Sequence, residues 1–244
     1  MREIVLDTET TGFDPFSGDR IVEIGAVELF NHMPTGKTFH EYIYPERSMP
    51  HEAFGVHGIG PDLLEPPQKP EKGQILLRDK PVFSKVGQSF LDFVGDSRMV
   101  IHNASFDMKF LNAELGWMNL PQLPMEQALD TLAIARKRYP GSPATLDALC
   151  RRFQIDNSNR TLHGALLDSE ILAEVYLELI GGRQPDFGLS TSVGGSAAGP
   201  AADDWRPTPR PTPLPSRITA AETEAHETFV ANLGDGALWN QNSG

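Results

Sequence analysis

Two carboxylates stand close together near the start of the chain. Asp7 and Glu9 follow the apolar run of residues 4–6 and precede Gly12. Alternate residues of a strand point to the same side, so the two side chains would project together, roughly 7 Å apart at the backbone. Two like charges on one side of a core strand are costly unless a cation lies between them, and a divalent metal ion would serve. The ordinary alternative for a lone D-x-E is a strand that ends in a polar loop.

Two further acids occur on apolar faces of expected helices. Asp107 precedes Phe110 and Leu111 by three and four residues, so its carboxylate should point toward the core. Asp168 repeats this pattern on a later helix, where it shares one face with Leu172, Val175 and Leu179. Unpaired acids are rarely buried, so their recurrence on two helices favours a functional site.

His163 lies just before the helix of Asp168, next to Gly164. Each of these residues also has an ordinary structural explanation. Asp107 could be a satisfied carboxylate at a helix start, Asp168 could pair with an arginine such as Arg160, and His163 could be a capping or core histidine. Four inward acids and one histidine together favour a shared site over these separate explanations.

Four carboxylates can hold two divalent ions ~3.5–4 Å apart, an arrangement suited to in-line attack on a phosphodiester. One ion lowers the pKa of a bound water, and the other stabilises the departing oxygen. A histidine titrates near neutral pH and suits the general base. Oxygen ligands favour Mg²⁺ or Mn²⁺ over zinc.

The composition limits the possible classes of protein. The 244 residues carry a net charge of −12, which argues against a protein that coats duplex nucleic acid. The charge remains compatible with an enzyme that holds only the end of a nucleic-acid strand, provided that a partner protein supplies most of the affinity for the nucleic acid. The only cysteine, Cys150, is expected in the core and suits a reducing cytoplasm. No apolar run approaches ~18 residues, and the N-terminus shows no signal-peptide pattern.

Alternating strand and helix patterns predict an α/β fold. Strands are expected at the N-terminus and over residues 20–30, 37–44 and 99–101, with the first three in an antiparallel meander. Helices are expected over residues 84–94, 104–115, 129–138, 144–153 and 165–180. The stretch 60–80, rich in Pro, Glu and Lys, should be a surface loop.

The composition changes after Gly182. Residues 183–216 are rich in Gly, Ser, Ala, Thr and Pro and should form a flexible linker. A helix with a capping box at Thr219–Glu222 should follow, with Phe229 and Leu233 at helical spacing. We therefore expect a domain over residues 1–182, a linker over 183–216 and a tail over 217–244.

These motifs resemble the DEDDh family of 3′→5′ exonucleases, and within it the proofreading subunits of bacterial replicative DNA polymerases. The resemblance covers residues 1–182 and is strongest over residues 7–12, 100–107 and 142–168. It implies a ribonuclease-H-like exonuclease fold, a mixed sheet flanked by helices. By resemblance, Asp7 bridges both ions, Glu9 and Asp168 bind the first, Asp107 helps to hold the second, and His163 is the base.

The resemblance also implies a pocket for the 3′-terminal nucleotide. Asp7, Glu9 and Asp168 would contact the substrate, and Thr10, Phe106 and His57 would line its pocket. For His57 alone, the alternative is an ordinary loop histidine. The insertion at residues 64–79 departs from the family pattern.

Partners follow from the same resemblance. Phe229, Leu233 and Trp239 of the tail would bind the polymerase (alpha) subunit. Gln184, Phe187 and Leu189 resemble the hexapeptide that binds the sliding clamp. A theta-like small subunit could join them. The location would be cytoplasmic, at the replication machinery.

The expected activity is the metal-dependent removal of mispaired 3′ nucleotides from single-stranded or frayed DNA, which releases nucleoside 5′-monophosphates. Two alternatives stay open. One is a 3′→5′ exonuclease of the same fold that trims RNA or oligonucleotides. The other is a non-catalytic linker between polymerase and clamp.

Overall fold

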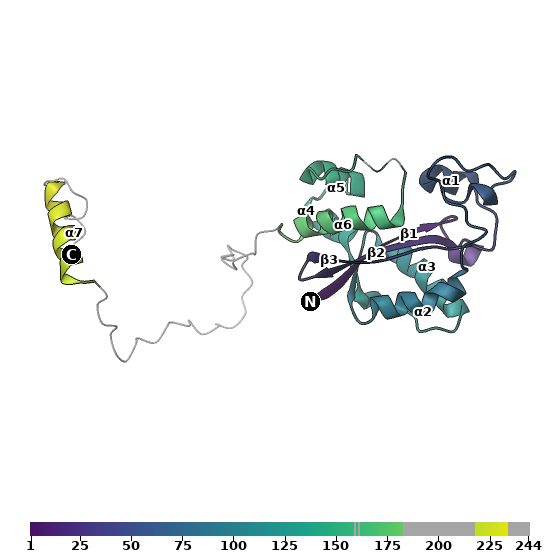
Figure 1. Cartoon of the computed structure of the whole chain (residues 1–244), viewed down its shortest axis with the longest axis horizontal. Helices are drawn as coiled ribbons and strands as arrows, with labels where there is room; N and C mark the ends of the chain where they lie inside the picture. Colours follow the sequence, from purple (N-terminus) through teal and green to yellow (C-terminus); the bar gives the residue numbers. More distant parts are fainter. Residues whose placement is uncertain (159, 161, 183–217, 234–244) are drawn as a thin grey trace, which may run out of the picture. The chain divides into compact units, whose positions relative to one another are not determined.

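A five-stranded mixed sheet forms the centre of the computed structural model, which describes residues 1–158, 160, 162–182 and 218–233. The strand order is β3-β2-β1-β4-β5 (Figure 1). The strands are β1 (Arg2–Thr10), β2 (Ile21–Phe30), β3 (Met33–Tyr42), β4 (Arg98–Ile101) and β5 (Ala128–Asp130). The first three pair antiparallel, as predicted, whereas β4 and β5 run parallel to β1.

The turn between β2 and β3 explains why the third strand differs from its predicted span of 37–44. Asn31 and His32 both have positive φ, 50° and 65°. Two such residues form a tight hairpin turn whose twist matches the flanking strands. Pairing therefore resumes at once, and β3 begins at Met33.

Seven α-helices are described. They are α1 (His51–His57), α2 (Phe83–Val94), α3 (Ala104–Trp117), α4 (Thr131–Arg138), α5 (Leu146–Phe153), α6 (Ala165–Leu179) and α7 (Ala220–Asn232). Short 3₁₀ turns occur at Pro15–Ser17, Pro61–Leu63 and Met125–Gln127. The prediction of a helix from residue 129 was wrong at its start, because residues 128–130 pair with β4 as a strand. The Asp130 carboxylate then caps α4 by accepting from the Leu132 N–H at 2.9 Å.

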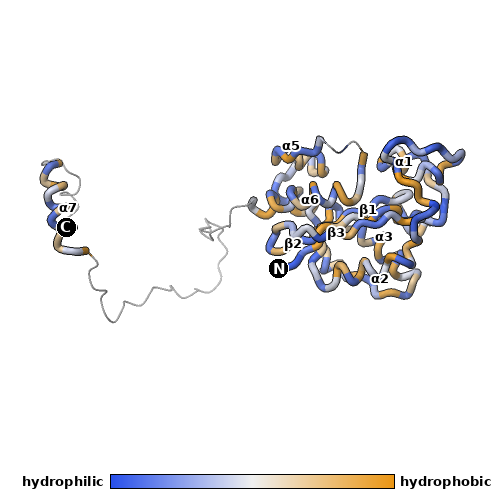
Figure 2. The backbone as a smooth tube through the Cα atoms, in the orientation of Figure 1, coloured by the Kyte–Doolittle hydropathy of each residue, from blue (hydrophilic) through white to orange (hydrophobic). Residues whose placement is uncertain are grey.

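Helices cover both faces of the sheet. Ile4 and Leu6 of β1 pack with α2 and α3, whereas Val5 packs with α5 and α6 on the other face (Figure 1). Hydrophobic and hydrophilic positions alternate along these helices (Figure 2). Since both faces of β1 are buried, side chains at its end are held on two opposite sides of the sheet.

The segment 60–80 is anchored more firmly than a simple surface loop. Leu63, Leu64 and Leu77 are buried in a third core cluster. The Asp62 carboxylate accepts from the N–H groups of Leu77 and Arg78, at 3.1 and 3.0 Å. The intervening residues 65–73 are exposed, so the expectation of a surface loop holds only for the middle of the segment.

The chain divides into two units, residues 1–189 and 190–244. In the second unit, α7 begins with the predicted capping box between Thr219 and Glu222. The predicted linker, residues 183–216, lies outside the described residues. Within the described part of the chain, no helix has the length and apolar character needed to cross a membrane.

Candidate active site

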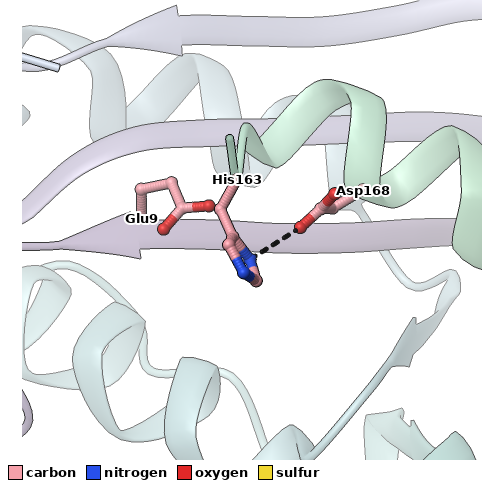
Figure 3. Close-up of side chains that lie close together, drawn as sticks. All are labelled: Glu9, His163 and Asp168. Carbon is pink, nitrogen blue, oxygen red and sulfur yellow. Dashed lines mark ion pairs between the residues drawn. The ribbon is translucent and has the colours of Figure 1, made fainter. Parts of the chain in front are cut away.

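A cavity of about 680 Å³ opens where β1 meets the start of α6. Asp7, Glu9, His163 and Asp168 all line it. One ligand atom each of Glu9, His163 and Asp168 lies within 4.8 Å of the others. Figure 3 shows these three side chains, which come from a strand, from the segment before α6 and from α6 itself. The structure thus brings residues from opposite ends of the domain into one potential metal centre.

Close packing against β2 positions the start of α6. A Cβ atom on Gly25 would lie 2.1 Å from the backbone nitrogen of Leu166, so only glycine permits this approach. The Ser169 hydroxyl donates to the Gly25 carbonyl at 2.8 Å. The buried Glu23 carboxylate accepts from the Ala165 N–H at 3.0 Å, which caps the helix. These contacts fix Asp168, one turn further along α6.

Burial and mutual repulsion act on the two acids of β1. Burial, then the charges of Asp107 and Glu9, raise the pKa of Asp7 well above its usual range, although its side chain is partly open to the cavity. Burial and the charges of Asp168 and Glu23 raise the pKa of Glu9 to about 9. A cation between these groups would favour their ionised forms.

Asp107 approaches the site from the other face of β1. It is buried at the start of α3 and accepts from the Thr8 hydroxyl at 2.7 Å. Burial raises its pKa to about 7. Asp107 does not line the 680 Å³ cavity, but it is close enough to Asp7 to raise the pKa of that carboxyl. The four acids therefore converge on the end of β1 from two sides rather than on one surface.

Asp168 forms an ion pair with Arg160, as in the structural explanation of this acid that the sequence left open. The guanidinium donates to both carboxylate oxygens, at 2.5 and 2.7 Å. Burial raises the pKa of Asp168, but the hydrogen bonds from Arg160, with a smaller effect of the adjacent His163, outweigh it and bring that pKa below its usual value. Because Nδ1 of His163 also lies 3.3 Å from Asp168, the ion pair is part of the site and not an alternative to it.

A second cavity, of about 480 Å³, adjoins the first at Glu9. Thr10, His57 and Phe106, the three residues that the resemblance assigns to a nucleotide pocket, line this cavity together with Phe13 and Val56. Burial lowers the pKa of His57 to about 4, so this imidazole is neutral at pH 7. Its Nδ1 accepts from the Ile59 N–H at 3.0 Å, which leaves the proton on Nε2.

The segment that carries His163 is tied to the wall of this pocket. The His163 N–H donates to the Val56 carbonyl at 3.2 Å. The imidazole itself remains exposed to the cavity.

The tail residues are described only in part. Phe229 lies on α7 and Leu233 directly follows its last residue, with 62% and 54% of their surface exposed. Trp239 and the clamp-binding residues Gln184, Phe187 and Leu189 lie outside the described residues.

Sequence reasoning missed three residues that build the site: Glu23, Gly25 and Asp147. Glu23 is a charged residue in the middle of the apolar run 21–29, and that break in the pattern was visible. Gly25 stands in the same strand, where glycine marks a close approach of backbones. Asp147, which binds Arg160 at 2.8 Å, gave no comparable signal.

Similarity to known proteins agrees with this geometry. A family model described as an exonuclease (RNase_T) matches residues 4–176. The DNA polymerase III subunit epsilon of Rickettsia felis is 52% identical over 190 residues, which cover 77% of each chain. The subunit epsilon of Escherichia coli is 47% identical over 189 residues, 75% of this chain and 72% of the relative.

Solved structures share the fold. The nuclease domain of 3′hExo, a DEDDh family member bound to rAMP, superposes with a TM-score of 0.57 at 18% identity, over 73% of this chain and 91% of that one. Exonuclease X in complex with 5′ overhanging duplex DNA gives a TM-score of 0.52 at 24% identity, over 73% and 90% of the two chains. The predicted ribonuclease-H-like exonuclease fold is thereby confirmed. The extent of the family match and the identity to these relatives show that the chain belongs to the exonuclease family and, within it, to the epsilon subunits of DNA polymerase III.

Proposed function

We propose that this exonuclease is a proofreading subunit that hydrolyses the 3′-terminal phosphodiester of single-stranded or mispaired DNA and releases nucleoside 5′-monophosphates. One observation carries the proposal. Ligand atoms of Glu9, His163 and Asp168 lie within 4.8 Å of one another, where the cavity of about 680 Å³ adjoins the pocket of about 480 Å³. A terminal nucleotide in that pocket would place its phosphate beside the carboxylates.

The donor set fits two Mg²⁺ or Mn²⁺ ions. All four acids offer hard oxygen ligands. Burial, followed by repulsion from neighbouring acids, raises the pKa values of Asp7 and Glu9, and a cation would oppose both effects. Asp7, Glu9 and Asp168 would hold one ion, and Asp7 and Asp107 would hold the other. Bound ions of this kind activate a water and stabilise the departing oxygen.

His163 would take the proton from the attacking water. Its imidazole is exposed to the cavity, and its backbone is fixed by the bond to Val56. A histidine with access to solvent can pass that proton on, so that each turnover restores the base.

The pocket favours a frayed end. Phe13, Phe106 and Val56 offer apolar and aromatic surface for one base and its sugar. A pocket of this size excludes a base that remains stacked and paired, so the terminal nucleotide must leave the duplex first. Mispaired ends fray more easily, and this difference is the physical basis for selectivity.

The test is digestion of 5′-labelled single-stranded DNA by the full chain. We expect shortening from the 3′ end with Mg²⁺ or Mn²⁺ and none with excess chelator. Asp7→Ala should abolish digestion while the circular dichroism spectrum stays unchanged. Robust digestion in chelator would refute the metal-dependent mechanism.

RNA is the alternative substrate, because the nuclease domain of 3′hExo, which shares the fold, was solved bound to rAMP. Matched DNA and RNA oligomers distinguish the two, and we expect faster digestion of DNA. A non-catalytic linker between polymerase and clamp is the other alternative. It needs none of the site residues, and unchanged replication fidelity with Asp7→Ala would favour it.

The partners of the tail are inferred from two exposed apolar side chains, one on α7 and one at its C-terminal end. Phe229 and Leu233 would bind the polymerase III alpha subunit together with Trp239, and Gln184, Phe187 and Leu189 would bind the sliding clamp. A tether to DNA-bound partners explains how a chain of charge −12 reaches DNA, because local concentration replaces affinity. Phe229→Ala with Leu233→Ala should abolish co-purification with alpha, whereas Thr228→Ala on the same helix should not. Co-purification of a small theta-like subunit would be scored in the same experiment.

A further inference from the structure

The guanidinium of Arg160 joins three groups at the candidate metal centre. Its Nε and one terminal nitrogen donate to the two oxygens of Asp168, at 2.5 and 2.7 Å. That terminal nitrogen also lies 2.7 Å from Nδ1 of His163. The other terminal nitrogen donates to Asp147 at 2.8 Å. Arg160 therefore occupies both oxygens of a carboxylate that a metal ion would need.

The two carboxylates bound by Arg160 differ in their surroundings. The side chains of Arg160 and Asp168 are 8% and 5% exposed, whereas that of Asp147 is 51% exposed. A buried, bidentate pair is strong, and breaking it leaves a charge without a partner. An incoming divalent ion supplies that missing partner for Asp168. The guanidinium can meanwhile keep its bond to Asp147, at the open edge of the cavity.

The contact with His163 links this exchange to the general base. An arginine N–H always donates, so Nδ1 must accept while the guanidinium faces it, and the imidazole proton then stays on Nε2. Once Arg160 withdraws, Nδ1 can carry the proton and donate to Asp168, which lies 3.3 Å away. Nε2 is then free to accept a proton from water.

We propose that Arg160 is a positioning residue that neutralises Asp168 before a divalent cation binds, then yields this carboxylate to the ion and remains on Asp147. The inference rests on the proposed metal-dependent function. It predicts that Arg160 and the cation compete for Asp168, so the arginine lowers metal affinity while it stabilises the metal-free site.

Calorimetric titration of the full chain with Mn²⁺, without DNA, tests the competition. Arg160→Gln should bind Mn²⁺ more tightly than wild type, by about tenfold. Its melting temperature without metal should fall, and its gain in melting temperature on saturation with Mn²⁺ should exceed that of wild type. Arg160→Lys keeps the positive charge but cannot donate to both carboxylate oxygens in the bidentate geometry of a guanidinium, so its Mn²⁺ affinity should lie between those of wild type and Arg160→Gln.

Arg136→Gln is the matched control, because Arg136 lines the same cavity but forms no ion pair with a carboxylate among the described residues. It removes one positive charge and should leave the Mn²⁺ affinity nearly unchanged. An equal gain in Arg136→Gln and Arg160→Gln would mean that general electrostatics, and not competition for Asp168, sets the affinity.

Asp147→Asn tests the second half of the proposal. Without the outer carboxylate, Arg160 should remain longer on Asp168 and weaken Mn²⁺ binding about threefold. In the Arg160→Gln background, the same substitution should have no further effect. If Asp147→Asn weakened Mn²⁺ binding equally in wild type and in Arg160→Gln, the proposed transfer of Arg160 from Asp168 to Asp147 would be refuted.

The failure of this inference is distinct from the failure of the proposed function. If wild type binds no Mn²⁺, the metal-dependent function fails. If wild type binds Mn²⁺ and both Arg160 variants bind it no more tightly, only the role of Arg160 fails. Because Arg160→Lys retains a charge beside Asp168, it decides the outcome should Arg160→Gln not fold.

Discussion

Substitution of Gly25 tests how the fold positions the site. A Cβ atom there would lie 2.1 to 2.4 Å from three backbone atoms of Ala165 and Leu166, at the start of α6. Ordinary contacts at Cβ atoms begin at 3.4 Å, so α6 must retreat by about 1 Å or more. Gly25 has no positive φ, so alanine fits its backbone and any effect arises from this contact.

The retreat would carry Asp168 with it. A misplacement of about 1 Å in a catalytic group can cost about 10²-fold in rate. Overpacking of this kind costs about 1–3 kcal/mol of stability. We therefore expect Gly25→Ala to fold with a lower melting temperature and to digest single-stranded DNA about 100-fold more slowly.

The assay is single-turnover digestion of 5′-labelled single-stranded DNA with saturating Mn²⁺, well below the melting temperature of each variant. Gly55→Ala in α1 is the matched control, because its Cβ would meet nothing within 4 Å. It should retain the rate of wild type. A folded Gly25→Ala that retained a rate within about threefold of wild type would refute the positional argument, given the loss expected from a shift of this size.

Three further perturbations probe the acids and their supports. In chelator, the melting temperature should fall as pH rises from about 5 to about 9. The reason is that Glu9, with a pKa of about 9, keeps in the folded state a proton that the unfolded chain releases near pH 4.5. Glu9→Gln should flatten this slope, and equal slopes of melting temperature against pH in wild type and variant would contradict the raised pKa of Glu9. Thr8→Val removes the hydroxyl that donates to Asp107, and it should weaken Mn²⁺ binding or activity by about 10-fold or more, whereas Thr8→Ser should not. Glu23→Ala leaves the Ala165 N–H without its acceptor and should lower the free energy of unfolding in urea by about 1–3 kcal/mol, with Glu23→Gln losing less.

Local patterns in the sequence were sufficient for much of the fold and for the choice of candidate residues. Strand and helix periodicity located most elements, and the capping box at Thr219 formed as predicted. The start of α4 was missed because pairing with β4, a tertiary contact, turned residues 128–130 into a strand. The buried ends of the 60–80 segment were missed because their leucines stand singly among prolines and charges.

The sequence by itself determined which side chains are available for chemistry: Asp7 and Glu9 on one side of a strand, Asp107 and Asp168 on apolar helix faces, and His163 before a helix. These placements depend on the fixed geometry of a strand or a helix, which neighbouring residues specify. Only the tertiary structure decided which of them meet. It placed Asp107 across β1 from the others, brought α6 against Gly25, and put Arg160 between Asp168 and Asp147. Such contacts join residues far apart along the chain, and the packing of the whole core sets their distances.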